Sequence, residues 1–214
     1  MALTLERERV EETAIRFVYP RPITFNEWLE ISGTKDFDEL IDGTIVEKPM
    51  VQLEHEKLNL WLFQVLGTFV DEKRLGTVLG SRSPVFINEF RGRMPDFFFV
   101  HKSREEVITS KATLGAPDLV IEIVSPNDRR SGINATETDY RAIGVAEIVY
   151  IDQPKTSIRV LRKTDTGYEP QTLATGDPLV LQSMGGVTLE WNWIFTEPRS
   201  SVLATVQQLL SPKI

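Results

Sequence analysis

Residues 119–124 read Leu-Val-Ile-Glu-Ile-Val, and this segment limits the possible folds more than any other part of the chain. A strand with apolar residues on both faces is normally covered on both sides. Residues 131–143 follow with helical spacing and end at Gly144, and a second strand is predicted at 147–152. A helix that joins two strands in this way makes a crossover connection, so the two strands should be parallel.

Glu122 is the one charged residue inside that apolar strand. Burial of an ionised carboxylate is costly unless the group is paired, hydrogen-bonded or bound to a metal. Strand alternation places Asp118, Val120 and Val124 on the same face. The alternative interpretation is that this face is open to water or that Glu122 pairs with an arginine, because fully buried acids are rare.

Asp96 stands directly before a second core strand, in Met-Pro-Asp followed by Phe-Phe-Phe-Val. Pro-Asp is also a common turn, and Pro117-Asp118 repeats the pattern before residues 119–124. Together with Glu122, however, Asp96 has a clearer chemical meaning. Two adjacent strands that each bring an acid to the same end can hold a hard cation, with water and phosphate completing its shell. Such a cation polarises a phosphoryl oxygen and lowers the pKa of a bound water.

The composition restricts the metal and the partner. The chain has no cysteine and only two histidines, His55 and His101, which excludes disulfides, Cys-based zinc sites, Fe–S clusters and a thiol nucleophile. Oxygen ligands suit Mg²⁺ or Mn²⁺. The net charge of −7 argues against general affinity for nucleic acid and leaves local basic residues to bind phosphate. The candidates are Arg82, Arg91, Arg93, Arg129 and Arg130.

The remaining elements follow from periodicity and turn signals. His55 lies on the inward face of the longest predicted helix, three positions before Leu58 and seven before Leu62. In the N-terminal part the pattern predicts a polar lead with a short helix in 1–20, a capping box at Thr24–Glu27, and a strand pair at 39–47 that turns at Asp42-Gly43 and is ended by Pro49. A helix from about Glu54 to Glu72, ended by Gly76, is followed by strands at 77–80, 84–88 and 97–100, with a turn at 90–93. The C-terminal part is predicted to contain a hairpin at 157–173, short strands around Gly185-Gly186 and a helix at 200–210.

The organisation expected from these elements is an extension at 1–23, one domain at 24–196 and a tail with a short helix at 197–214. No window is apolar enough for a transmembrane span, and the N-terminus lacks the apolar core of a secretory signal. We therefore expect no membrane partner and a cytoplasmic location.

The order and spacing of these motifs resemble a known family. Glu39-Leu-Ile-Asp-Gly43, His55 at the start of the long helix, Pro95-Asp96, the run from Ala116 to Pro126 and the stretch from Tyr140 to Asp152 are similar to the Uma-type restriction-endonuclease-like family of the PD-(D/E)xK nuclease superfamily. The resemblance covers roughly Thr24 to Phe195. It implies an α/β (α+β) fold with a restriction-endonuclease-like core of helix, three-strand meander, helix and strand, an N-terminal helix and hairpin, and C-terminal β additions.

The same resemblance implies site residues. Asp96 and Glu122 become the carboxylates that bind Mg²⁺ or Mn²⁺, and His55 or Glu39 completes the site from the opposite wall. The alternatives are a helix-start histidine satisfied by the backbone and a plain strand-end acid.

The chain departs from the family pattern at the lysine. In the superfamily's Glu-x-Lys the lysine position is Val124 here. In the narrower family an aspartate and a lysine lie on the following helix, and those two positions are Gly132 and Thr136. Lysine in this role would orient the attacking water and offset phosphate charge, whereas threonine carries no charge. The departure puts the activity in doubt and leaves the fold unaffected.

The leading functional hypothesis is therefore a metal-dependent DNA endonuclease whose activity is weak or lost. DNA binding should be weak and salt-sensitive, and a homodimer is plausible by analogy because duplex cleavage needs two cuts. The alternatives are a non-catalytic nucleic-acid-binding protein and a structural subunit that retain the fold.

Overall fold

The computed structural model describes residues 6–9, 15–32, 38–47, 52–126 and 128–211. The chain forms two compact units, each assembled from segments that are far apart in the sequence. The first unit takes up Met1–Met50, Gly80–Pro95 and Glu106–Ala116, and the second Val51–Leu79, Asp96–Glu105 and Pro117–Ile214. No helix in the described ranges is long and apolar enough to cross a membrane. The domain boundaries expected at residues 23 and 196 stay a prediction.

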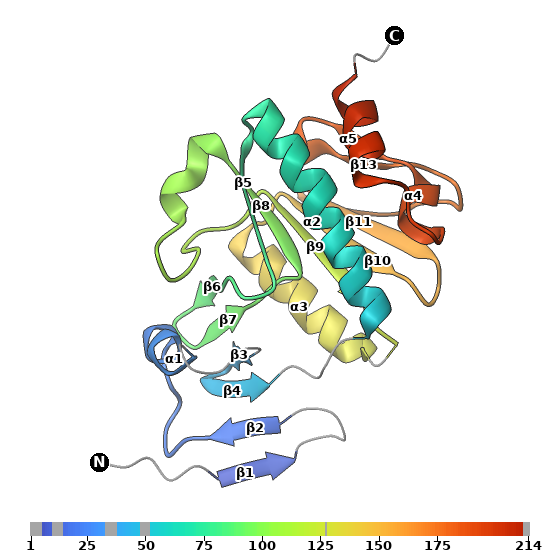
Figure 1. The fold of residues 1–214 in the computed structure, drawn as a ribbon. Coiled ribbons are helices and arrows are strands. Elements are labelled where there is room, and N and C mark those ends of the chain that lie inside the picture. The colour runs from blue at the N-terminus through green and yellow to red at the C-terminus, as the bar shows by residue number, and fades with distance from the viewer. Residues whose placement is uncertain (1–5, 10–14, 33–37, 48–51, 127, 212–214) are drawn as a thin grey trace. The chain divides into compact units, whose positions relative to one another are not determined.

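The first unit contains a six-stranded antiparallel sheet with strand order β1-β2-β4-β3-β7-β6 (Figure 1). Its elements are β1 (Glu6–Arg9), β2 (Ile15–Val18), α1 (Phe25–Ser32), β3 (Asp38–Ile41), β4 (Thr44–Glu47), β6 (Val85–Asn88) and β7 (Arg91–Arg93). The short helix expected in residues 1–20 is wrong for the described part of that segment, which forms the paired strands β1 and β2. The turn predicted at 90–93 is shorter in the structure than expected, because residues 91–93 form strand β7.

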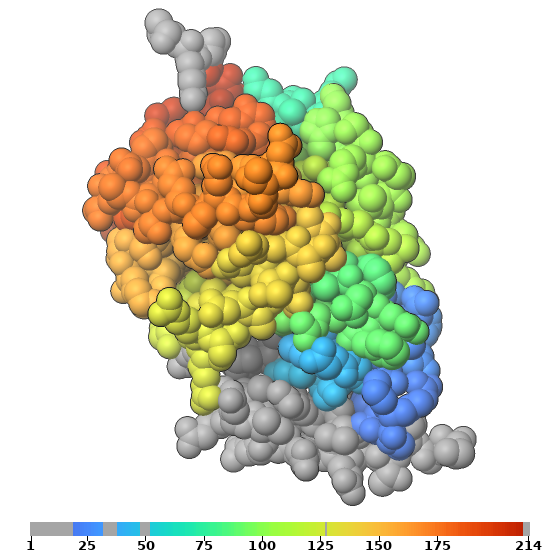
Figure 2. Space-filling view, turned by 180° about the vertical axis from the view of Figure 1, so that it is seen from behind, coloured from blue at the N-terminus to red at the C-terminus, as the bar shows by residue number. Residues whose placement is uncertain are grey.

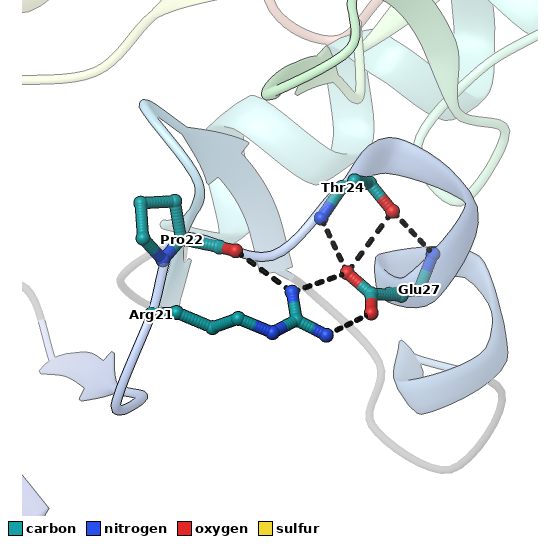
Figure 3. Close-up of polar contacts among 4 residues, drawn as sticks. All are labelled: Arg21, Pro22, Thr24 and Glu27. Carbon is teal, nitrogen blue, oxygen red and sulfur yellow. Dashed lines mark hydrogen bonds and ion pairs between the residues drawn. The ribbon is translucent and has the colours of Figure 1, made fainter.

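The capping box at the start of α1 is confirmed (Figure 3). The Thr24 backbone N–H donates to Glu27 Oε2 at 2.8 Å, and the Glu27 N–H donates to Thr24 Oγ1 at 3.3 Å, so two backbone donors at the helix start are satisfied reciprocally. Arg21 also donates to the Glu27 carboxylate. The hydrogen bonds from Arg21 first, and then from Thr24, lower the pKa of Glu27 from 4.5 to about 2.

The turn between β3 and β4 falls at Asp42-Gly43, as expected. Ile41 pairs with Thr44, and the two residues between them have φ values of 51° and 73°, as a two-residue hairpin turn with positive φ at both positions requires. A Cβ on Gly43 would also lie 2.5 Å from Pro22 Cβ, so glycine is needed for space as well as for conformation. The predicted end of this strand pair at Pro49 lies outside the described residues.

The second unit contains a mixed six-stranded sheet with order β12-β11-β10-β9-β8-β5. Strands β9 and β10 are parallel, which confirms the crossover through α3, and all other pairs are antiparallel. The elements are α2 (Leu53–Lys73), β5 (Gly76–Leu79), β8 (Phe97–His101), β9 (Leu119–Val124), α3 (Arg130–Ile143), β10 (Glu147–Asp152), β11 (Ser157–Thr164), β12 (Gly167–Thr172), β13 (Leu179–Leu181), η2 (Gln182–Met184), β14 (Val187–Leu189), α4 (Trp191–Phe195) and α5 (Val202–Leu210), and the 3-10 helix η1 (Lys102–Val107) follows β8.

Helices α2 and α3 lie on opposite faces of this sheet (Figure 1). The buried stripe of α2 packs with Leu119, Ile121 and Ile123 of β9 in one hydrophobic core. The alternate residues of β9 face α3, which lies at the surface beside β11 and β12 when the molecule is seen from behind (Figure 2). Glu122 therefore points away from the main core, toward α3.

Two local predictions in the second unit need correction. The core meander is β5-β8-β9, because the strand at 85–88 belongs to the other sheet. Helix α2 ends at Lys73 with Arg74 in the left-handed conformation, so Gly76 does not end it. Gly76 instead opens β5 with φ 153°, where a Cβ would lie 2.1 Å from the Val100 carbonyl oxygen.

Candidate functional site

Of the two acids singled out by the sequence, Asp96 lies directly before β8 and Glu122 lies within the adjacent strand β9 of the second unit. Phe97 pairs with Ile121 in the antiparallel β8–β9 ladder, so Asp96 and Glu122 occupy the next position of the same ladder. The Ile123 N–H donates to Asp96 Oδ2 at 2.9 Å, which ties Asp96 directly to the backbone of β9. The convergence of the Asp96 and Glu122 carboxylates on one cation stays a prediction.

His55 contacts Asp96 from helix α2. Its Nε2 lies 3.1 Å from Asp96 Oδ2, and its side chain is only 5% exposed. The second ring nitrogen, Nδ1, is buried and lies 3.6 Å from Glu56 Oε1. Burial lowers the pKa of His55, but the hydrogen bond and charge of Asp96, with the charges of Glu56 and Glu122, outweigh burial and raise it above 6.5. Of the two residues expected to complete the site, His55 is the one that the structure places against Asp96.

Glu122 is the only residue of β9 that is not buried. Its Oε1 accepts a hydrogen bond of 2.5 Å from the hydroxyl of Tyr140 on α3. The sequence-based hypothesis gave Tyr140 no role in the site. The available signal was chemical: a buried tyrosine hydroxyl needs a hydrogen-bond partner, and an acid lay on the strand before the helix.

Thr136 lies one turn before Tyr140 and is half-buried. Its hydroxyl donates to the Gly132 carbonyl oxygen of the same helix at 3.0 Å. Gly132 is exposed, and a Cβ added there would meet nothing within 4 Å. The two positions where the family carries aspartate and lysine therefore lie one turn apart on α3, and the outer one has room for a larger side chain.

Glu39 belongs to the first unit and has a structural partner there. Its Oε2 accepts from Arg93 Nη1 at 2.7 Å and its Oε1 from the Met94 N–H at 3.3 Å. Both side chains of this ion pair are almost fully buried. The contacts account for a buried acid at this position without a metal, so the interpretation of Glu39 as a strand-end acid gains support.

Asp118, the second acid of a Pro-Asp step, is also held structurally. Its Oδ2 accepts from the His101 N–H at 2.8 Å, and its Oδ1 accepts from Arg104 Nη1 at 2.7 Å. The other histidine of the chain therefore contributes its backbone to this contact, and its ring contacts Ser103. Asp118 fixes the end of β8 and carries its own counter-ion.

A pocket of about 180 Å³ opens beside His55, at the end of strands β9 and β10. Its lining mixes polar and apolar side chains and comprises Gln52, Glu54, His55, Val124, Ser125, Pro126, Gln153 and Pro154. Val124, at the lysine position of the Glu-x-Lys pattern, thus lines the same pocket as His55.

The five arginines proposed for phosphate binding fall into two groups. Arg91 pairs with Asp42 and Arg93 with Glu39, so two of them serve the first unit. Arg82, Arg129 and Arg130 are exposed. Arg129 is the N-cap of α3 and Arg130 its first residue, and no acid lies in the first turn. Positive side chains at the positive end of a helix dipole cost helix stability, which favours a role in binding an anion.

The donor set suits a hard cation in part. No group of three or more His, Asp or Glu side chains that could hold a metal ion occurs among the residues that the structure describes. Magnesium, however, is commonly bound through one or two carboxylates, with water and substrate phosphate in the remaining positions. A pair of carboxylates on adjacent strands fits that mode of binding.

Comparison with known proteins identifies relatives of the chain. Residues 24–192 match the model of a family, Uma2, described as "Putative restriction endonuclease". A crystal structure of a "putative nuclease belonging to DUF820" from Anabaena variabilis ATCC 29413 superposes with a TM-score of 0.64 at 22% identity, covering 88% of this chain and all of that one. No curated protein matches the chain. The structural neighbour supports the restriction-endonuclease-like fold predicted from the sequence.

Proposed function

Because the chain belongs to the Uma2 family of restriction-endonuclease-like proteins, we propose that it is a divalent-metal-dependent nuclease acting on DNA phosphodiester bonds. Asp96 and Glu122 would hold the ion, Mg²⁺ or Mn²⁺. The observation that supports this proposal is that Asp96, directly before β8, and Glu122, on β9, are adjacent in the register of this strand pair, with His55 against Asp96.

The bound ion would polarise a phosphoryl oxygen and lower the pKa of a coordinated water. The protein's own residues supply orientation. The Ile123 N–H and His55 fix Asp96 Oδ2, so the carboxylate cannot rotate freely. Preorganised groups of this kind need no rearrangement during the reaction. The exposed Arg129 and Arg130 would bind the DNA backbone, and the acidic net charge would keep that binding weak and sensitive to salt.

The first experiment is a thermal melt with increasing Mn²⁺ or Mg²⁺. Ligand linkage predicts about 2.7 kcal/mol of stabilisation at a hundredfold excess over the dissociation constant, which is roughly 5 to 10 °C for a chain of this size. Asp96→Asn and Glu122→Gln should abolish the metal-induced shift. Each shift is measured against the same variant without metal, because the substitutions change stability by themselves.

Asp118→Asn is the matched control. Asp118 also follows a proline and also accepts a backbone N–H from the neighbouring strand, but its charge is neutralised by Arg104. The variant should lose stability and keep the full metal-induced shift. Equal shifts in the wild type, Asp96→Asn and Glu122→Gln would refute the metal site.

A specific observation favours a second function, a non-catalytic nucleic-acid-binding protein. Both lysine positions of the family pattern carry uncharged residues, Val124 and Thr136, while the arginines at the start of α3 are exposed. A plasmid-nicking assay with Mn²⁺ separates the two functions. The non-catalytic alternative predicts DNA binding and metal stabilisation with no nicking above that of Asp96→Asn.

A further inference from the structure

Tyr140 connects helix α3 to the candidate metal site. Its side chain is fully buried, and its hydroxyl donates to Glu122 Oε1 at 2.5 Å. We infer that Tyr140 is a positioning residue, which fixes one oxygen of Glu122 and so sets the direction of the carboxylate toward the ion. The inference rests on the proposed role of Glu122 as a metal ligand.

The helix that carries Tyr140 is anchored to the same face of the sheet. Glu137, three residues earlier, accepts from Arg159 Nη2 on β11 at 2.5 Å. The Arg159 guanidinium lies 4.9 Å from the centre of the Tyr150 ring on β10. Tyr150 is in register with both Arg159 and Glu122. Three neighbouring strands thus present one row of side chains to α3, and the helix contacts this row at both ends.

This arrangement has a chemical consequence for Glu122. A carboxylate that is fixed at one oxygen presents the other in a defined direction, so less rearrangement is needed when a metal binds. Hydrogen-bond partners of metal ligands typically contribute 10- to 100-fold to metal affinity. Loss of the Tyr140 hydroxyl should therefore weaken metal binding while leaving both candidate ligands in place.

The test is a calorimetric titration of the full-length wild type and of Tyr140→Phe with Mn²⁺. The variant keeps the ring and removes only the hydroxyl. We expect the dissociation constant for Mn²⁺ to rise about tenfold. A value within twofold of the wild type would overturn the inference. Failure of the wild type itself to bind Mn²⁺ would instead refute the proposed metal site, so the two failures are distinguishable.

Two control variants separate positioning from general packing. Tyr168→Phe removes another tyrosine hydroxyl, which donates to the Val145 carbonyl oxygen at 2.6 Å. Glu137→Gln loosens the other anchor of α3 without touching Glu122. Both should lower the melting temperature and leave the Mn²⁺ dissociation constant within twofold of the wild type. A tenfold rise in either control would overturn the specific role of the Tyr140 hydroxyl.

A Tyr140→Phe protein that is unfolded at the titration temperature is tested on melting temperature instead. In the Tyr140→Phe variant the Glu122 carboxylate no longer accepts a hydrogen bond from residue 140. Adding Glu122→Gln removes the negative charge of that carboxylate, so the double variant should recover most of the lost melting temperature. Absence of any recovery would overturn the inference.

Discussion

Removal of the Asp96 carboxylate should destabilise the protein even in the absence of metal. Asp96 Oδ2 accepts from the Ile123 N–H at 2.9 Å and lies 3.1 Å from His55 Nε2. Hydrogen bonds to a charged group contribute about 1.5 to 3 kcal/mol each, so their sum is about 3 to 6 kcal/mol. The side chain is 16% exposed, and water can replace part of the loss. We therefore expect Asp96→Ala to lower the free energy of unfolding by about 3 kcal/mol, at the lower end of this range.

For a chain of this length, about 3 kcal/mol corresponds to a fall of roughly 6 to 12 °C in melting temperature. Asp96→Asn keeps an oxygen that can accept from the Ile123 N–H and should lose about half as much, because neutral hydrogen bonds contribute roughly 1 kcal/mol. The assay is thermal and urea unfolding at pH 7 in EDTA. Melting of Asp96→Ala within 2 °C of the wild type would refute the hydrogen bonding on which this reasoning depends.

Three further predictions concern the lysine position, DNA binding and the first helix. Thr136→Lys combined with Gly132→Asp should raise Mn²⁺-dependent plasmid nicking about a hundredfold, since a charged donor would be restored and Gly132 has room for a side chain. The same double variant carrying Asp96→Ala controls for contaminating nuclease. No gain in a folded double variant would contradict the assignment of Thr136 to the lysine position. Arg129→Ala with Arg130→Ala should lower the salt slope of duplex binding by up to about 2 in fluorescence anisotropy, and an unchanged slope would exclude α3 from the interface. Because the pKa of Glu27 is lowered to about 2, the contribution of its carboxylate to stability is complete above pH 4.5 and is lost as the pH falls toward 2. The difference in free energy of unfolding between the wild type and Glu27→Gln, measured in urea, should therefore narrow over that range. A constant difference would contradict this prediction.

The elements set by local interactions were predictable from the sequence. The capping box of α1 and the Asp42-Gly43 turn each depend on residues within a few positions of one another. The α2 stripe and the β9–α3–β10 crossover follow from side-chain period alone. The sheet to which a strand belongs was not predictable in this way. The strand at 85–88 has the pattern of its neighbours, yet it pairs with β7 in the first unit, because strand pairing depends on contacts distant in sequence.

The two candidate acids could be proposed from the sequence, whereas the side chains that contact them could not. Asp96 and Glu122 carry a local signal, a charge at the edge or in the middle of an apolar strand. The partners of these acids, His55 and Tyr140, come from two different helices, and only the fold decides which helical residue meets which strand. Their inward-facing positions were nevertheless readable from helical spacing.

The two Pro-Asp steps show what the local sequence leaves open and what the fold then decides. Asp96 and Asp118 each accept a backbone N–H from the adjacent strand, so the motif has the same structural task in both places. They differ in the side chain that each carboxylate contacts in addition to this backbone N–H. Asp118 meets Arg104, a permanent cation that neutralises its charge, whereas Asp96 meets His55, whose charge depends on protonation, and lies next to Glu122 in the β8–β9 ladder. At Asp118 a divalent ion would have to compete with arginine for the carboxylate. This difference in contacts supports the proposal that Asp96, rather than Asp118, is the metal-binding acid of the two Pro-Asp steps.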